Sequence, residues 1–222
     1  MSDFDLCKNQ DVVLLSSSGM DSTLLNAIAL ANGNSVHPLF VHSGFAWENA
    51  ERNMLQKIVA AFCHSRLQPI QEISISGQTV YDNSWMFTHD TPQWQDDARP
   101  RTNTIPGRNI SLLSLAYVFA ANKGIDNVIL GISGHAYPDA KQDFLDQFVM
   151  AMNIGLSTNI RLYCPLPSAS TEQIAAFVQD TPTIPWNLSF SCYNPTNEFT
   201  PCGDCYKCTE TKNKRLSWKI DK

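Results

Sequence analysis

A short apolar run near the start of the chain constrains the fold most, because a polar turn and a helical pattern follow it at once. Residues 12–15, Val-Val-Leu-Leu, are too few for a helix and suit a strand that is buried on both faces. The turn at residues 16–19 reads Ser-Ser-Ser-Gly, and apolar residues then recur at helical spacing from Asp21 until Asn32-Gly33 ends the helix. The chain therefore begins with a strand, a tight loop and a helix.

The same alternation continues along most of the chain. Further strands are predicted at residues 36–41, 70–75, 128–130 and 160–164, and further helices at about residues 48–62, 108–122, 144–152 and 170–178. Ser170 and Gln173 form a capping box for the last of these helices. This rhythm implies an α/β fold with a doubly wound parallel sheet. Residues 76–103 and the residues from Thr181 onward lack such periodicity, and we expect them to be irregular.

Composition and charge exclude several classes of protein. With 222 residues, of which 43% are apolar, the chain is long enough for one domain with an appendage and too apolar to be disordered. Sixteen Lys and Arg against 21 Asp and Glu give a net charge of -5, so no global basic field attracts nucleic acid. No apolar run reaches the roughly 18 to 20 residues that span a bilayer, and the acidic start does not resemble a secretory signal. We therefore expect a cytoplasmic protein with no nucleic-acid or membrane partner.

Residues 17–22, Ser-Ser-Gly-Met-Asp-Ser, connect the first strand to its helix. Backbone N–H groups of small residues, the helix N-terminus and the hydroxyls of Ser17 and Ser22 can bind a phosphate, and Asp21 suits Mg²⁺. An ordinary strand–helix connection in which Asp21 is only the N-cap stays open. The Walker and dinucleotide motifs are both absent. The order Ser-x-Gly-x-Asp-Ser resembles the pyrophosphate-binding loop of the N-type ATP pyrophosphatases, which cleave ATP between its α- and β-phosphates.

Four of the seven cysteines cluster late in the chain, at Cys192, Cys202, Cys205 and Cys208. In a reducing compartment such clusters indicate a metal site or reactive thiols before disulfides. Two overlapping Cys-x-x-Cys turns and one distant Cys can complete the tetrahedral shell of a structural Zn²⁺. A redox pair and a [4Fe–4S] cluster stay open as alternatives. We expect an α/β domain over residues 1–185 and a zinc-binding segment over residues 186–222.

Two further segments carry polar side chains to the mouth of the predicted sheet. A Pro-Gly turn at residues 106–107 opens a helix that begins with Arg108 and Asn109. Residues 131–139 follow a strand at the edge where open α/β sheets bind ligands, and there Tyr137 can stack on a planar base while Asp139 accepts from its N–H groups. The simpler interpretations are a solvated arginine after a turn and an N-cap aspartate. His135 is expected to be a loop residue rather than a ligand.

Taken together, these segments resemble the 7-cyano-7-deazaguanine synthase family. The family pattern is Ser-Gly-Gly-x-Asp-Ser, Val-Pro-Gly-Arg-Asn, Gly-Tyr-Pro-Asp-Cys-Arg, and Ser-Cys-Tyr with Cys-Gly-x-Cys-x-x-Cys. The matching residues here are 17–22, 105–109, 136–141, 191–193 and 202–208. The resemblance implies an adenine nucleotide alpha hydrolase-like fold and a reaction in which ATP activates the carboxylate of 7-carboxy-7-deazaguanine. Ammonia then forms the C–N bond, and a second activation gives the nitrile.

The resemblance also implies roles for individual residues and partners. The residues expected to bind ATP are Ser17, Ser18, Gly19, Asp21 and Ser22. The residues expected to act in catalysis are Asp21, which also binds Mg²⁺, Arg108 and Lys141. The residues expected to contact the deazapurine are Arg108, Asn109, Tyr137 and Asp139. The zinc ligands would be Cys192, Cys202, Cys205 and Cys208, and the chain would form a homodimer.

The chain departs from the family pattern at four places. Ser18 replaces the first glycine of the loop and adds a Cβ where the backbone approaches phosphate. Ala140-Lys141 replaces Cys-Arg, residues 131–137 form a shorter loop, and Thr209-Glu210 stands where the family usually has Leu-Arg. Two alternatives therefore stay open. One is transfer of the activated deazapurine to a protein or peptide amine, and the other is a non-catalytic sensor of nucleotide or deazapurine.

Overall fold

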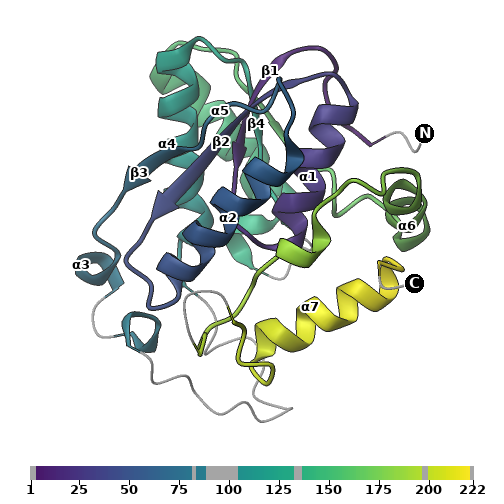
Figure 1. The fold of residues 1–222 in the computed structure, drawn as a ribbon. Coiled ribbons are helices and arrows are strands. Elements are labelled where there is room, and N and C mark those ends of the chain that lie inside the picture. The colour runs from purple at the N-terminus through teal and green to yellow at the C-terminus, as the bar shows by residue number, and fades with distance from the viewer. Residues whose placement is uncertain (1–3, 82–83, 89–104, 133–136, 197–199, 221–222) are drawn as a thin grey trace.

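The computed structural model describes residues 4–81, 84–88, 105–132, 137–196 and 200–220, and in these residues five strands form one parallel sheet (Figure 1). The strands lie in the order β3-β2-β1-β4-β5. Their bounds are β1 Asp11–Leu15, β2 Ser35–His42, β3 Gln71–Ser74, β4 Asn127–Ile129 and β5 Arg161–Tyr163. The buried run Val12 to Leu14 takes the central strand, because only there are both faces of a strand covered. The predicted α/β class with a parallel sheet is confirmed.

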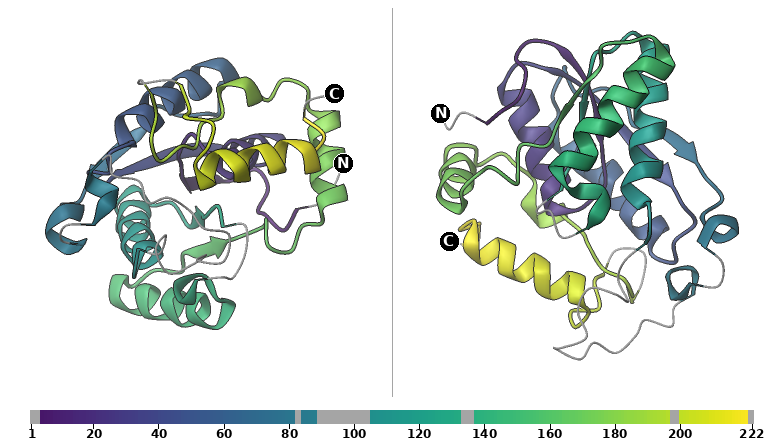
Figure 2. Two further views of the ribbon diagram at one scale, coloured as in Figure 1. Left: turned by 90° about the horizontal axis from the view of Figure 1, so that it is seen from below. Right: turned by 180° about the vertical axis from the view of Figure 1, so that it is seen from behind.

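Helices cover both faces of this sheet. Their bounds are α1 Met20–Ala31, α2 Glu48–Phe62, α3 Gly77–Tyr81, α4 Arg108–Lys123, α5 Gln142–Leu156, α6 Thr171–Asp180 and α7 Tyr206–Ser217, with short 3-10 helices η1 Trp85–Phe87, η2 Pro138–Ala140 and η3 Trp186–Leu188. Val12 and Leu14 share a core with α1 and α6, whereas Val13 and Leu15 share a core with α4 and α5. Figure 2 shows α1 and α2 on one side of the sheet and α4 and α5 on the other.

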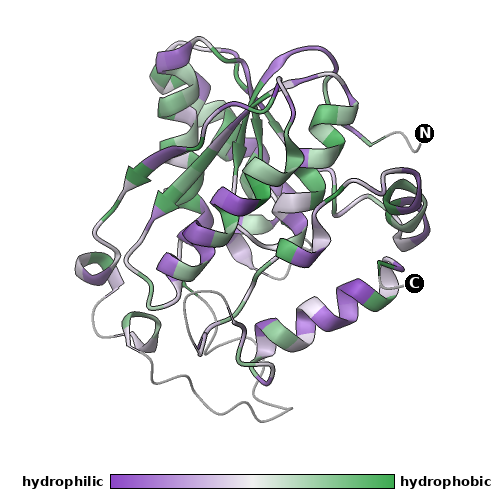
Figure 3. Cartoon of the chain, viewed as in Figure 1, coloured by the Kyte–Doolittle hydropathy of each residue, from purple (hydrophilic) through white to green (hydrophobic). Residues whose placement is uncertain are grey.

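The sequence predicts the central elements to within a few residues. The capping box at α6 is present in part, because the Gln173 N–H donates to Ser170 Oγ at 3.1 Å. Two predictions of irregular structure are wrong. Residues 76–103 include α3 and η1, although residues 89–104 lie outside the described residues, and the residues after 181 include α7. Helix α7 has no buried residue and hence no apolar stripe for a pattern to detect, and Figure 3 shows its mostly hydrophilic course.

The segment after α6 returns to the main fold and is anchored there at two places. Trp186 and Trp218 lie in the core beside α1, with ring centroids 6.0 Å apart. Farther along, the Phe190 N–H donates to the Ser18 carbonyl at 2.7 Å, and Ser18 Oγ donates to the Phe190 carbonyl at 2.9 Å. Cys205 is the N-cap residue of α7, so this helix is fixed near both of its ends. The predicted division between residues 185 and 186 stays a prediction.

No helix within the described ranges is long and apolar enough to cross a membrane.

Candidate active site

A cavity of about 220 Å³ opens where the carboxyl ends of β1, β2 and β4 meet. Its floor is formed by residues at these strand ends, among them Leu15, Val41 and Leu130. The chain places β2 and β4 on opposite sides of β1, so the strand order reverses here. Open α/β sheets bind their ligands at such a reversal, because the loops on the two sides diverge and leave a crevice.

The loop at residues 17–22 forms one wall of the cavity, to which Ser17, Gly19, Asp21 and Ser22 all contribute. The Ser17 N–H donates to Ser22 Oγ at 2.9 Å, and the Gly19 N–H donates to Ser17 Oγ at 3.2 Å, so the loop is folded back on itself. Gly19 is the N-cap residue of α1 and no side chain caps the helix. The alternative in which Asp21 is only an N-cap is therefore wrong, and the first turn of α1 faces the cavity.

Ser18 differs from its neighbours in this loop. Its side chain is fully buried and does not line the cavity. The hydroxyl is instead bonded to the Phe190 carbonyl, on the far side of the loop. The extra Cβ of this serine therefore lies away from the space in which a phosphate would bind.

Helix α7 forms the opposite wall, and sequence reasoning missed it. Lys207, Glu210 and Lys214 line the cavity at a spacing that puts them on one face of the helix. Lys214 Nζ lies 2.8 and 2.7 Å from the two carboxylate oxygens of Asp21, with both side chains about one-fifth exposed. Glu210 lies 2.7 Å from Lys207 Nζ and 3.4 Å from Lys214 Nζ. In the sequence, the charged residues at this spacing directly after the cysteines were the signal from which this wall could have been predicted.

The charged side chains of α7 shift one another's pKa values. Burial alone would raise the pKa of Glu210, but the charges of Lys207 and Lys214 outweigh it, and the pKa lies below its ordinary value. Burial would lower the pKa of Lys207, but Glu210 outweighs it, and the pKa lies above its ordinary value. The face of α7 thus presents fixed charges to the cavity at neutral pH.

Arg108 and Asn109 reach the cavity from the start of α4, as the sequence predicts. Gly107 precedes them with φ of 69°, a left-handed conformation that favours glycine. The Arg108 guanidinium lies 5.5 Å from the centroid of the Phe45 ring, which also lines the cavity. Asp139 accepts from the Asn109 N–H at 2.9 Å and from Asn109 Nδ2 at 3.2 Å, so this carboxylate fixes the start of α4.

Besides Ser18, three residues expected at the site do not line this cavity. They are Tyr137, Asp139 and Lys141. Tyr137 is 37% exposed, and Lys141 is an exposed residue that precedes α5 as its N-cap. His135 and the rest of residues 133–136 lie outside the described residues.

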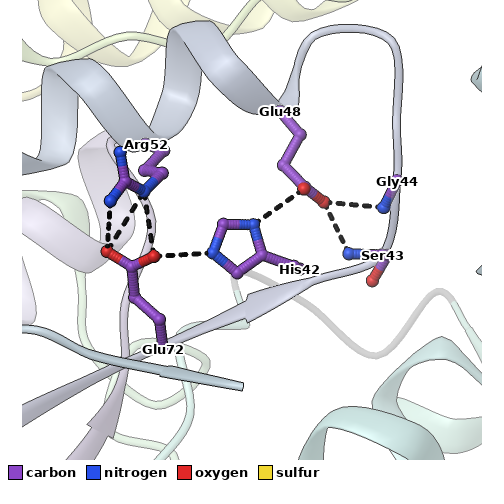
Figure 4. A network of polar contacts seen from close by, with 6 residues as sticks. All are labelled: His42, Ser43, Gly44, Glu48, Arg52 and Glu72. Atoms are coloured by element: carbon purple, nitrogen blue, oxygen red, sulfur yellow. Dashed lines mark hydrogen bonds and ion pairs between the residues drawn. The ribbon is translucent and has the colours of Figure 1, made fainter. Parts of the chain in front are cut away.

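A polar network beside the cavity fixes the loop between β2 and α2 (Figure 4). Glu48 accepts from the Ser43 N–H at 2.5 Å and the Gly44 N–H at 2.9 Å, and it bonds His42 Nδ1 at 2.9 Å. Glu72 bonds His42 Nε2 at 2.8 Å and pairs with Arg52. Burial lowers the pKa of His42, but the two carboxylates outweigh it and raise the pKa above its ordinary value. This network holds Ser43 and Phe45 at the cavity, and no motif in the sequence signalled it.

Glu51, in the first turn of α2, also lines the cavity and was missed. Its side chain is partly exposed, and its carboxylate takes part in no hydrogen bond or ion pair with the residues that the structure describes. Burial raises the pKa of Glu51 to about 7, although the charges of Arg108 and Lys207 oppose this shift and Glu48 adds to it. Glu51 is therefore a carboxyl group of the cavity that can change its protonation near neutral pH.

The four clustered cysteines come together beside α2 and α7. Their sulfur atoms all lie within 4.8 Å of one another, with separations of 3.5 Å (Cys192–Cys202), 3.6 Å (Cys205–Cys208), 3.9 Å (Cys202–Cys208) and 4.0 Å (Cys192–Cys205). A tetrahedral Zn²⁺ with Zn–S bonds of about 2.3 Å holds its sulfurs about 3.8 Å apart. Sulfurs this close enclose a single ion and leave no room for a four-iron cluster. The cluster therefore fits zinc.

Comparison with known proteins gives one consistent result. A family model described as "Queuosine biosynthesis protein QueC" matches residues 11–216. The 7-cyano-7-deazaguanine synthase of Leptospira interrogans (serovar Lai) is 28% identical over 213 residues, which cover 92% of this chain and 85% of that protein. The synthase of Prochlorococcus marinus is 27% identical over 233 residues, 97% of each chain.

Among solved structures, a 4-thiouridine synthetase determined as an RNA complex with bound ATP has a TM-score of 0.54 and 14% identity to this chain. The match covers 95% of this chain and 53% of that one, so the chain spans about half of that protein. At this identity the likeness concerns the fold alone.

Proposed function

Since the chain belongs to the family of the queuosine biosynthesis protein QueC, whose members are ATP-dependent 7-cyano-7-deazaguanine synthases, we propose that its cavity is where 7-carboxy-7-deazaguanine is activated. The observation that carries this proposal is the meeting of the phosphate loop, Arg108 and the charged face of α7 around one space. These parts come from the start, middle and end of the matched segment. The family supports the activity, and the residues that line the cavity support the proposed location.

The loop at residues 17–22 would bind the β- and γ-phosphates of ATP. Its small residues and the uncapped first turn of α1 offer backbone N–H groups to an anion, with the hydroxyls of Ser17 and Ser22 beside them. Asp21 would hold the Mg²⁺ that accompanies ATP, because its carboxylate faces the cavity and already attracts a cation, the Lys214 ammonium. Magnesium supplies charge neutralisation on the phosphates.

Arg108, Lys207 and Lys214 would stabilise the charge that develops on the leaving pyrophosphate. The substrate carboxylate attacks the α-phosphate, the bond to the β-phosphate breaks, and an acyl-adenylate and pyrophosphate result. Ammonia displaces AMP to give the amide. A second adenylation, on the amide oxygen, followed by loss of AMP, gives the nitrile with two ATP consumed.

The cysteine cluster would hold zinc in a structural role. Four thiolates close the tetrahedral shell and leave no open position for a substrate. Cys205 is the N-cap of α7, and Cys192 follows Ser191, which lines the cavity. Zinc bound there would fix the beginning of α7, and through it the charged face that the cavity requires.

The described residues give the two alternatives little support. Transfer to a protein amine rests on Ala140-Lys141 and on the shorter loop at residues 131–137; Lys141 is exposed and does not line the cavity, and residues 133–136 of the loop lie outside the described residues. The sensor was motivated by Ser18, whose side chain lies away from the cavity. We accordingly propose ammonia as the acceptor, and we propose a cytoplasmic homodimer as the family resemblance implies.

The experiment uses purified protein with ATP, Mg²⁺, 7-carboxy-7-deazaguanine and an ammonium salt. Pyrophosphate release is followed together with mass spectrometry of the products. We expect pyrophosphate release that requires the deazapurine carboxylate, an amide intermediate, and finally the nitrile with two AMP per product. Absence of carboxylate-dependent pyrophosphate release would refute the proposed function, and an amide-linked deazapurine on a partner protein would refute ammonia as the acceptor.

A further inference from the structure

We propose that Glu51 is a catalytic residue that accepts the proton lost by the nitrogen nucleophile when the C–N bond forms. This inference rests on the proposed function, because it assigns a role within the second half of that reaction. It goes beyond the activation of the carboxylate, which the phosphate loop and the cavity cations explain without Glu51.

Glu51 lines the cavity from a different element than the phosphate loop. It stands on α2, while α4 brings Arg108 and α7 brings Lys207 to the same part of the cavity. These two cations are suited to hold an anionic substrate group near the Glu51 carboxylate.

Among the described residues that line the cavity, every other carboxylate is already engaged. Asp21 bonds Lys214 through both oxygens, Glu48 accepts from two backbone N–H groups and bonds His42, and Glu210 pairs with two lysines. Glu51 has no such partner within the described residues. Its lone pairs are therefore available to a ligand, which is the first requirement for proton transfer.

The electrostatic surroundings of Glu51 suit it to accept a proton from the nitrogen nucleophile. The charged groups that act on it are Arg108 from α4, Lys207 from α7 and Glu48 from its own helix. Burial dominates, and it raises the pKa of Glu51 to about 7. A carboxylate with a pKa near the working pH is a stronger base than an ordinary glutamate and still releases its proton between turnovers.

The proposed step balances in atoms and charge. The nitrogen of ammonia attacks the carbonyl carbon of the acyl-adenylate, and the C–N bond forms. The bond from that carbon to the AMP oxygen breaks, and AMP leaves with the electron pair. A proton passes from the nitrogen to the Glu51 carboxylate, from which it later leaves to solvent.

The test separates the two half-reactions in Glu51→Gln, a substitution that keeps the size of the side chain and removes its basicity. Carboxylate-dependent pyrophosphate release, measured in the first turnover without ammonium, should stay within about threefold of the wild type. Amide formation with ammonium should fall about 100-fold or more, the range that removal of a general base produces. Hydroxylamine, a stronger nucleophile that is largely unprotonated at neutral pH, should restore product formation as the hydroxamate.

The matched control is Glu172→Gln, the same change at an exposed position in the first turn of α6, which does not line the cavity. It should leave the rates of pyrophosphate release, amide formation and hydroxamate formation unchanged. If Glu51→Gln lowers pyrophosphate release as much as amide formation, or if hydroxylamine gives no rescue, Glu51 acts in binding and the inference is overturned. A wild type without carboxylate-dependent pyrophosphate release would instead refute the proposed function, so the two failures are distinguishable.

A pH profile of the wild type tests whether Glu51 accepts the proton, even if Glu51→Gln does not fold. Per concentration of free ammonia, amide formation should rise with pH through about 7, because the Glu51 carboxyl must lose its own proton before it can accept another. Hydroxamate formation should lack this rise. A rise that is identical for both nucleophiles would overturn the inference.

Discussion

Replacement of Ser18 by alanine should destabilise the protein and leave ATP binding unchanged. The serine hydroxyl is fully buried and donates to the Phe190 carbonyl at 2.9 Å, and Phe190 is itself 2% exposed. Removing the donor leaves a buried carbonyl with one partner fewer, which costs about 1–3 kcal/mol. Ser18→Gly, which restores the family residue, should cost about 0.4–1 kcal/mol more, because glycine gains freedom in the unfolded chain.

At about 2–4 °C per kcal/mol for a chain of this size, Ser18→Ala should lower Tm by roughly 2–12 °C. Thermal unfolding measures the stability, and titration with ATP and Mg²⁺ measures the affinity. Ser17→Ala is the matched control, because the Ser17 side chain lines the cavity and is only partly buried. It should weaken ATP binding with little change in Tm.

The opposite pattern would refute this reasoning. If Ser18→Ala keeps the wild-type Tm and changes ATP affinity, the hydroxyl of Ser18 faces the phosphates and its bond to the C-terminal segment contributes nothing. The same conclusion would follow if Ser18→Gly were both more stable and tighter for ATP.

Three further predictions address the loop, the metal and the polar network. Asp21→Asn should reduce pyrophosphate release about 100-fold or more at saturating ATP and Mg²⁺, because it removes the cavity carboxylate that is proposed to hold the Mg²⁺ of ATP. Near wild-type turnover would contradict the phosphate-loop assignment. Purified protein should contain one zinc per chain by elemental analysis, and Cys205→Ser should lose the metal; iron with sulfide would contradict this. His42 should stabilise the fold most below pH of about 6.5 and lose this contribution as pH rises through its raised pKa. Unfolding measured across this range should therefore show a fall in stability for the wild type that His42→Asn lacks.

The sequence predicts the sheet well because its central strand and first helix are encoded locally. The apolar run before Ser17 can only be buried on both faces, and the small residues after it can only form a tight loop. The sequence predicts the metal site equally well, because metal ligands such as Cys205 and Cys208 need a fixed spacing along the chain.

The charged half of the cavity was not predictable in the same way. Lys207 and Lys214 lie on a helix without an apolar stripe, and nothing in their spacing says that this helix crosses the edge of a sheet formed by distant residues. Glu51 looks like any exposed residue of an amphipathic helix until α4 and α7 are placed around it. In contrast, the role of Tyr137 came from its place in a loop after a strand and the role of Lys141 from resemblance alone, and the residues that line the cavity include neither.

The placement of α7 sets an order of assembly during synthesis. The sheet is complete once Tyr163 has been made, and a nascent chain of that length already holds every strand and the helices of both cores up to α5. The charged wall from residues 207–214 is translated later, as are the four cysteines, whose zinc is proposed to fix the start of α7. Domains fold progressively from the N-terminus as they are synthesised. A ribosome-bound chain can therefore have a finished sheet while the wall from α7 is still missing, and under the proposed function such a chain could not yet activate its substrate.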